Sequence, residues 1–149
     1  MYSAYDNLST GLKNTLNGMK ARHSSKHVFG KDRASRHDDT VGRIRNPEAA
    51  NQDAIHPVVI KHPDTGRKAL YVNPTFTLGF DGWTDAESKP LLDYLYQHAT
   101  RPEFTCRFEW KPGSIAFWDN RCTLHKAIWD YHPMERKGRR VTIKGTVPY

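Results

Sequence analysis

The sequence of 149 residues has the size of a single domain and is long enough to bury a hydrophobic core. It contains no run of about eighteen or more apolar residues, so no segment has the pattern of a transmembrane helix. The first residues also lack the basic and apolar regions of a secretory signal. Cys106 and Cys122 form neither a metal-binding spacing nor a disulfide framework. We therefore expect a cytoplasmic protein without membrane segments.

The net charge of +7 raises the question of nucleic-acid binding. Much of the positive charge lies in residues 21–46, where few aromatic residues are interleaved, and this pattern favours a solvated loop. A second basic cluster, "ERKGRR" at 135–140, directly precedes an apolar stretch. Such a cluster suits a small anionic molecule at least as well as a phosphate backbone, so nucleic acid is not the expected partner.

The first predicted element is a helix that starts after Ser9, a suitable N-cap, and continues to about residue 22. Its apolar side chains Leu12, Leu16 and Met19 recur at helical spacing. Residues 23–55 are polar, charged and without periodicity, which predicts a long loop. We accordingly divide the chain into a helical segment with a long polar loop (1–55) and a second part (56–149).

The second part begins with two short predicted strands, Val58–Lys61 and Ala69–Val72, joined by a turn with Pro63, Asp64 and Gly66. A helix is predicted next in "TDAESKPLLDYLYQHAT", where Thr84 and Glu87 have the spacing of a capping box. Because Pro90 lies near its start, Ser88 is an alternative first residue.

Three further strands are predicted at 104–110, 114–119 and 139–145. In the first, Phe104, Cys106, Phe108 and Trp110 alternate onto one face, and "KPGS" (111–114) turns the chain into the second. Short antiparallel strands with one interposed helix predict a mainly β protein with flanking helices, either a β-sandwich or a jelly roll.

A potential metal site is suggested by His125, which follows the turn in "WDNRCTLH", and by Arg136 and Arg140, eleven and fifteen residues later. The two arginines have equal parity and would face one way in an extended strand, although Gly138 lies between them. Arginine binds carboxylates and sulfonates through paired, charge-assisted hydrogen bonds. By themselves these residues are more typical of a structural histidine and of solvated arginines.

Three stretches, "HPVVIKHPDTGRKALYVNPTFT", "PEFTCRFEWKPGSIAFWDNRCTLH" and the arginines that follow, resemble the C-terminal half of the TauD/TfdA family. These proteins are Fe(II)- and 2-oxoglutarate-dependent dioxygenases that act on taurine and other sulfonates. The resemblance extends from about residue 5 to 147. It implies a double-stranded β-helix, a jelly-roll variant, in which two histidines and one carboxylate bind iron.

The resemblance implies a role for each of four residues. His125 corresponds to the distal iron ligand, and Arg136 to the arginine that binds 2-oxoglutarate. Arg140 corresponds to the arginine that meets the anionic group of the substrate, and Phe76 to an aromatic residue of the substrate pocket. Core packing would explain Phe76 equally well.

The family's other two iron ligands form an H-x-D or H-x-E pair on an earlier strand, which would fall before residue 1. We therefore expect an incomplete jelly roll that lacks its N-terminal side. Two segments of the chain match the H-x-D pattern: His37-Asp38-Asp39 in the polar loop and His62-Pro63-Asp64 in the predicted turn. A loop holds metal ligands poorly, and Pro and Asp serve the turn itself, so neither is expected to bind iron.

The sequence thus predicts a dioxygenase that uses Fe(II), 2-oxoglutarate and O₂ to hydroxylate a small anionic substrate, such as a sulfonate, sulfate ester or carboxylate. Activity of this chain alone is doubtful because two ligands are missing. A non-catalytic remnant of such an enzyme and, less favoured, a basic nucleic-acid-binding module stay open, as does a homo-oligomer.

Overall fold

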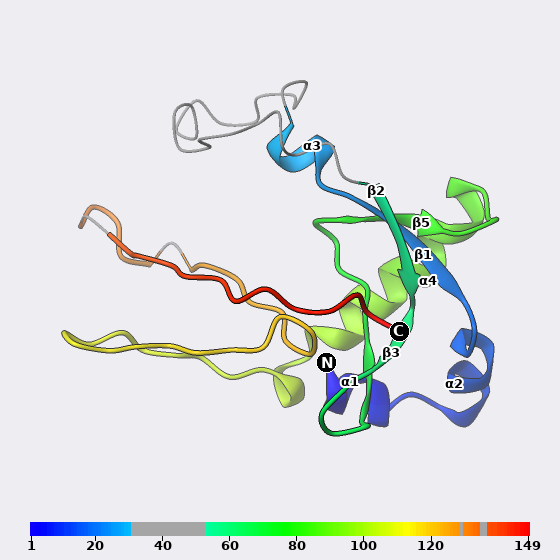
Figure 1. Cartoon of the computed structure of the whole chain (residues 1–149), viewed down its shortest axis with the longest axis horizontal. Coiled ribbons are helices and arrows are strands. Elements are labelled where there is room, and N and C mark those ends of the chain that lie inside the picture. The colour runs from blue at the N-terminus through cyan, green and yellow to red at the C-terminus, as the bar shows by residue number, and fades with distance from the viewer. Residues whose placement is uncertain (31–52, 129, 135–136) are drawn as a thin grey trace.

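The computed structural model describes residues 1–30, 53–128, 130–134 and 137–149. Its described elements follow one another as α1 (Tyr2–Asp6), α2 (Thr10–Leu16), β1 (Lys20–Ser24), α3 (Lys26–Phe29), β2 (Asp53–Pro57), β3 (Val59–Lys61), β4 (Lys68–Leu70), β5 (Thr77–Phe80), α4 (Asp85–Ala99) and the 3₁₀ turn η3 (Pro102–Phe104). Figure 1 shows the helices and strands gathered on one side and two long irregular segments extending away from them.

The N-terminal helix is shorter than predicted. Ser9 caps α2 as expected, since its hydroxyl accepts a hydrogen bond from the amide of Leu12. The helix ends at Leu16, however, because Asn17 is extended and Gly18 turns the chain at a φ of 82°. The prediction of a helix to residue 22 and of a loop from residue 23 was therefore wrong at this point, where β1 and α3 are found instead.

The first sheet has three antiparallel strands in the order β2-β1-β5. β1 is central: Arg22 pairs with Ile55 of β2 and with Gly79 of β5. Hydrogen bonds therefore connect residues before and after position 55, while the proposed division of the chain at this position stays a prediction.

The second sheet is the hairpin β3-β4, in which Val59 pairs with Leu70 and Lys61 with Lys68. It confirms the two strands predicted here, with slightly different bounds. Its turn includes Gly66, whose φ of 68° favours glycine. Val58 joins the sheets, because its amide donates to the carbonyl of Met19 and its carbonyl accepts from the amide of Tyr71.

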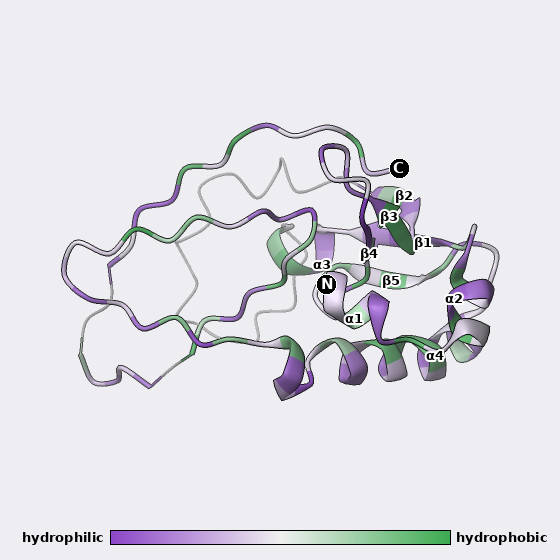
Figure 2. Ribbon diagram, turned by 90° about the horizontal axis from the view of Figure 1, so that it is seen from below, coloured by the Kyte–Doolittle hydropathy of each residue, from purple (hydrophilic) through white to green (hydrophobic). Residues whose placement is uncertain are grey.

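Helix α4 begins with the predicted capping box, in which Thr84 and Glu87 each accept a hydrogen bond from the other's backbone amide. The helix starts at Asp85, so the alternative start at Ser88 was wrong and Pro90 lies inside it. Figure 2 shows α4 along one side of the sheets, with its hydrophilic residues away from them. Its buried residues share a core with α1, α2 and both sheets, formed by Ala4, Leu16, Val58, Leu70, Phe80 and Leu95 among others.

The strands predicted at 104–110, 114–119 and 139–145 were wrong as assigned, since no strand is formed in the described part of these segments. A β-strand requires hydrogen bonds from a neighbouring strand. Apolar side chains here are largely exposed, among them Ile115 at 90%, Phe117 at 87% and Val141 at 92%. The alternating pattern is thus present without the packing surface that would cover its apolar face.

Among the described residues, none of the helices has the length and hydrophobicity needed to cross a membrane.

We predict that stability decreases as the pH falls from 6.5 towards 4. Burial of His23, and then the charge of the neighbouring His56, lower the pKa of His23 from 6.5 to about 4. The unfolded chain therefore binds the proton more strongly, and up to about 3 kcal/mol of stability would be lost across this range. Chemical denaturation at several pH values measures it.

The variant His23→Asn should flatten this part of the pH profile, because an asparagine side chain can keep the hydrogen bond to the Thr77 hydroxyl without titrating. His27→Asn is the matched control, since His27 is exposed. An unchanged profile in His23→Asn would contradict the assignment.

A second prediction concerns self-association through the irregular segments. Exposed apolar side chains in extended chains without strand partners favour contacts between molecules. We expect an average mass that rises above 17.2 kDa with concentration in sedimentation experiments. The double variant Ile115→Lys, Phe117→Lys should shift it back towards the monomer, whereas Leu78→Lys, on the paired strand β5, should not. Equal effects of both would argue against these segments as the contact.

Candidate active site

The predicted metal ligand His125 lies in an irregular segment and is exposed. Its imidazole contacts the indole of Trp118, with ring centroids 4.8 Å apart. A turn between them, closed by a hydrogen bond from the amide of Cys122 to the carbonyl of Asp119, reverses the chain. The sequence "WDNRCTLH" therefore forms a loop that returns His125 to the side of Trp118.

This loop is attached to the β3-β4 hairpin through His62, which is only 6% exposed. The amides of Asp64 and Thr65 point at Nδ1 of His62, at 3.3 and 3.4 Å, so Nδ1 is an acceptor. The proton then resides on Nε2, which donates to Asp119 Oδ2 at 3.0 Å. The turn thus fixes the orientation of a buried histidine whose Nε2 points at the loop.

Asp119 is the centre of the charged contacts in the loop. Arg121 donates to its carboxylate from its backbone amide, from Nε and from Nη2, the last at 2.7 Å. The guanidinium of Arg121 also reaches Asp64 Oδ2 of the hairpin turn at 3.1 Å. Hydrogen bonds from Arg121 first, and from His62, hold the pKa of Asp119 well below its usual range, and the carboxylates raise that of Arg121.

The side chains His62, Asp119 and Cys122 place three atoms that could bind a metal within 4.8 Å of one another. The hydrogen bonds described above already account for the first two, and the adjacent guanidinium opposes a cation. No described trio of such ligands includes His125. Within the described residues, the donor set therefore does not fit the two-histidine, one-carboxylate iron site that the family resemblance implies.

The two predicted arginines are either exposed or outside the described ranges. Arg136, predicted to bind 2-oxoglutarate, is outside them, as are His37 and Asp39. Arg140 is described and exposed. Whether the two arginines converge with His125 on one cavity therefore stays a prediction.

Phe76, predicted to line the substrate pocket, is partly buried and packs against Phe29, with ring centroids 5.9 Å apart. Backbone hydrogen bonding places it, because its carbonyl accepts from the amide of Ser24 at the end of β1. Phe29 was not predicted as a site residue, because its segment was interpreted as a loop. The sequence feature that could have indicated it is an aromatic residue among charged ones.

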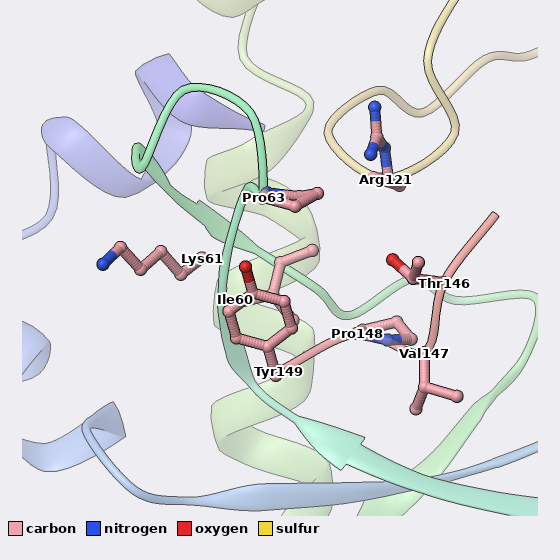
Figure 3. A pocket seen from close by; sticks show the side chains of 8 residues that line it. All are labelled: Ile60, Lys61, Pro63, Arg121, Thr146, Val147, Pro148 and Tyr149. Carbon is pink, nitrogen blue, oxygen red and sulfur yellow. The ribbon is translucent and has the colours of Figure 1, made fainter.

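Figure 3 shows a small pocket between β3, Arg121 and the C-terminal residues 146–149. Its volume of about 10 Å³ offers room for one water molecule. The amide of Lys61 donates to the carbonyl of Tyr149 beside it. This pocket is too small for an organic substrate, so it is not a candidate active site.

Comparison with known proteins shows similarity to dioxygenases. The family model of the taurine catabolism dioxygenases, TauD and TfdA, matches residues 1–142. A solved taurine dioxygenase from Burkholderia xenovorans superimposes with a TM-score of 0.63 at 38% identity, over 80% of this chain and 36% of that one. The chain therefore belongs to the TauD/TfdA family, as the sequence motifs predicted.

Curated relatives give the same result. A protein of Schizosaccharomyces pombe named as an alpha-ketoglutarate-dependent sulfonate dioxygenase is 38% identical over 99% of this chain. An alpha-ketoglutarate-dependent sulfate ester dioxygenase of Pseudomonas putida is 34% identical over 98% of it. The chain spans 36% and 48% of the lengths of these two relatives.

We predict that Asp119→Ala lowers the free energy of unfolding by about 2–3 kcal/mol, because it leaves a buried His62 N–H without its acceptor and leaves the Arg121 guanidinium with Asp64 alone. Asp130→Ala is the matched control, since the ion pair of Asp130 with Arg107 is exposed and should contribute less than about 1 kcal/mol. Urea denaturation compares them, and equal losses would refute the central role of Asp119.

Proposed function

We propose that this chain provides part of the active site of an Fe(II)- and 2-oxoglutarate-dependent dioxygenase. The observation that carries the proposal is the block "WDNRCTLH" with arginines eleven and fifteen residues beyond its histidine, inside a region that the TauD/TfdA family model matches. Relatives with this similarity are named as sulfonate and sulfate ester dioxygenases. The resemblance further suggests that the complete fold is a jelly roll.

In this proposal, His125 is one ligand of the iron and Arg136 binds a carboxylate of 2-oxoglutarate. The exposure of His125 is consistent with a ligand whose metal partners come from elsewhere. Since no described ligand trio includes His125, the remaining iron ligands would have to come from polypeptide outside the described residues. The lengths of the relatives, more than twice the matched region, leave room for such polypeptide.

Arg140 would bind the anionic end of the substrate, because a guanidinium forms paired hydrogen bonds with sulfonate, sulfate and carboxylate oxygens. Phe76, together with Phe29, would form an apolar wall for the carbon part of the substrate. This combination suits a small molecule with one anionic and one aliphatic end, such as taurine or an alkyl sulfate. O₂ is the second co-substrate.

A non-catalytic form of such an enzyme is the second candidate, and the lack of a complete ligand set around His125 in the described residues favours it. Both candidates predict the same family membership. They differ in whether His125 and Arg136 act in a reaction.

For the chain alone, we predict negligible succinate formation from 2-oxoglutarate in the presence of Fe(II) and taurine. A single imidazole cannot retain iron while leaving positions open for co-substrate and oxygen. Succinate is measured for the chain and for His125→Ala. Robust turnover abolished by His125→Ala would show that the other ligands lie within these 149 residues, and His37 with Asp39 would be the first pair to test.

A chimera tests the proposed function itself. Residues 1–149 replace the matched region of the Pseudomonas putida sulfate ester dioxygenase, and succinate formation is measured with Fe(II), 2-oxoglutarate and an alkyl sulfate. We expect activity that is lost in His125→Ala and reduced at least tenfold in Arg136→Met, with Lys137→Met as the adjacent control. A folded but inactive chimera would favour the non-catalytic candidate.

A further inference from the structure

The segment that carries His125 has no strand partner among the described residues, so other contacts must determine where this side chain lies. Most of the side-chain hydrogen bonds of this loop involve Asp119, six residues earlier, and the N-terminal amine of Met1 also donates to the carbonyl of Cys122 at 3.0 Å. Figure 3 shows the loop of Arg121 opposite the hairpin residue Pro63, so that the loop faces the hairpin turn. The position of His125 therefore depends on how firmly this loop is attached.

The attachment to the hairpin uses two parallel connections. His62, buried in the hairpin, donates to Asp119 at 3.0 Å, and Asp64 of the same turn accepts from Arg121 at 3.1 Å. Within the loop, Arg121 and Asp119 are bonded to each other. Three side-chain contacts thus connect four residues, two on each side, and the backbone amide of Asp64 closes the ring by donating to His62 Nδ1 at 3.3 Å. A ring of this kind resists both translation and rotation of the loop, which a single contact would not.

The ring determines the position of His125 because only a few residues of the chain lie between Asp119 and His125. Trp118 adjoins Asp119, and its indole N–H donates to Asn120 Oδ1 at 2.9 Å. The turn closed between Asp119 and Cys122 then brings His125 against the Trp118 ring. An anchored Asp119 therefore fixes both the ring that supports the imidazole and the direction of the chain that leads to it.

We infer that His62 and Asp119 are positioning residues for His125, with His62 acting as a fixed hydrogen-bond donor from the hairpin and Asp119 as the anchor of the loop. The positioning of His125 is argued from these contacts alone. The inference rests on the proposed function only where it treats His125 as a metal ligand. The sequence "HPDTG" is then more than a turn: its histidine and aspartate are the hairpin's half of the ring.

A metal ion bound by His62, Asp119 and Cys122 would be the competing explanation of the same cluster. It would require His62 to lose the Nε2 proton that it donates to Asp119, and it would place a cation next to the Arg121 guanidinium. The hydrogen-bonded ring satisfies these groups without either cost. The ring is therefore the arrangement that the geometry supports.

The test measures the contact between Trp118 and His125 in the 149-residue chain labelled with ¹³C and ¹⁵N. The rings are close enough for a nuclear Overhauser cross-peak between indole and imidazole protons. In His62→Leu, the new side chain has a similar size but no hydrogen-bond donor. We expect this variant to reduce the cross-peak at least threefold. His62→Gln should retain it, because a glutamine N–H can occupy the position of the histidine Nε2–H.

Arg67→Met is the matched control, because Arg67 belongs to the same hairpin but contacts Asp6 and the ring of Tyr2 instead of the loop. Its cross-peak should equal that of the unmodified chain. A full cross-peak in His62→Leu, or a loss in His62→Gln equal to that in His62→Leu, would overturn the inference. The resonances of α4 report whether each variant is folded.

If His62→Leu does not fold, Asp119→Asn replaces it, since this change keeps an acceptor for His62 and removes the charge that binds Arg121. We expect a cross-peak weakened at least twofold, and an unchanged one would overturn the inference. The chimera described above separates the two proposals. A chimera that folds but forms no succinate would contradict the proposed function and leave the cross-peak result valid.

Discussion

The carboxylate of Asp119 is the interaction on which the C-terminal part of the structure depends. It accepts hydrogen bonds from two groups of Arg121 within the loop and from the buried His62 of the hairpin. Because these donors stabilise the charged form, the pKa of Asp119 is held well below its usual range. A charged anchor explains how an irregular segment can have a defined place.

The same part of the chain shows what an anchor cannot provide. Side chains such as Ile115 and Phe117 alternate as in a strand that is buried on one face, but they are almost fully exposed. Burial of each such side chain would stabilise the protein by about 2 kcal/mol, and that contribution requires a covering surface. Alternation is a property of the sequence, whereas a strand is a property of two hydrogen-bonded segments. The segments 104–119 and 139–145 have the first without the second.

Local signals in the sequence were sufficient where the structure is determined locally. Ser9 and the capping box of Thr84 and Glu87 act through neighbours within three residues, and the hairpin with Gly66 acts through its turn. β1 could not be predicted in the same way, because the alternation of Ala21 and His23 is masked by charged neighbours and its partners lie 29 or more residues away. The stop at Asn17-Gly18 was visible, but the spacing of Leu12, Leu16 and Met19 outweighed it.

The site residues show the same difference between what a local sequence pattern indicates and what depends on contacts in the fold. His125 and Arg140 were chosen from a motif and a spacing, and their roles rest on the family to which the chain belongs. His62 was considered only as a metal ligand and set aside because turn chemistry explained its surroundings. The structure shows that this chemistry has a second consequence: the amides of the turn occupy Nδ1 and thereby direct the Nε2 proton to Asp119. In the proposed function, His62 would therefore serve the metal site without touching the metal, by determining where the loop that carries His125 is held.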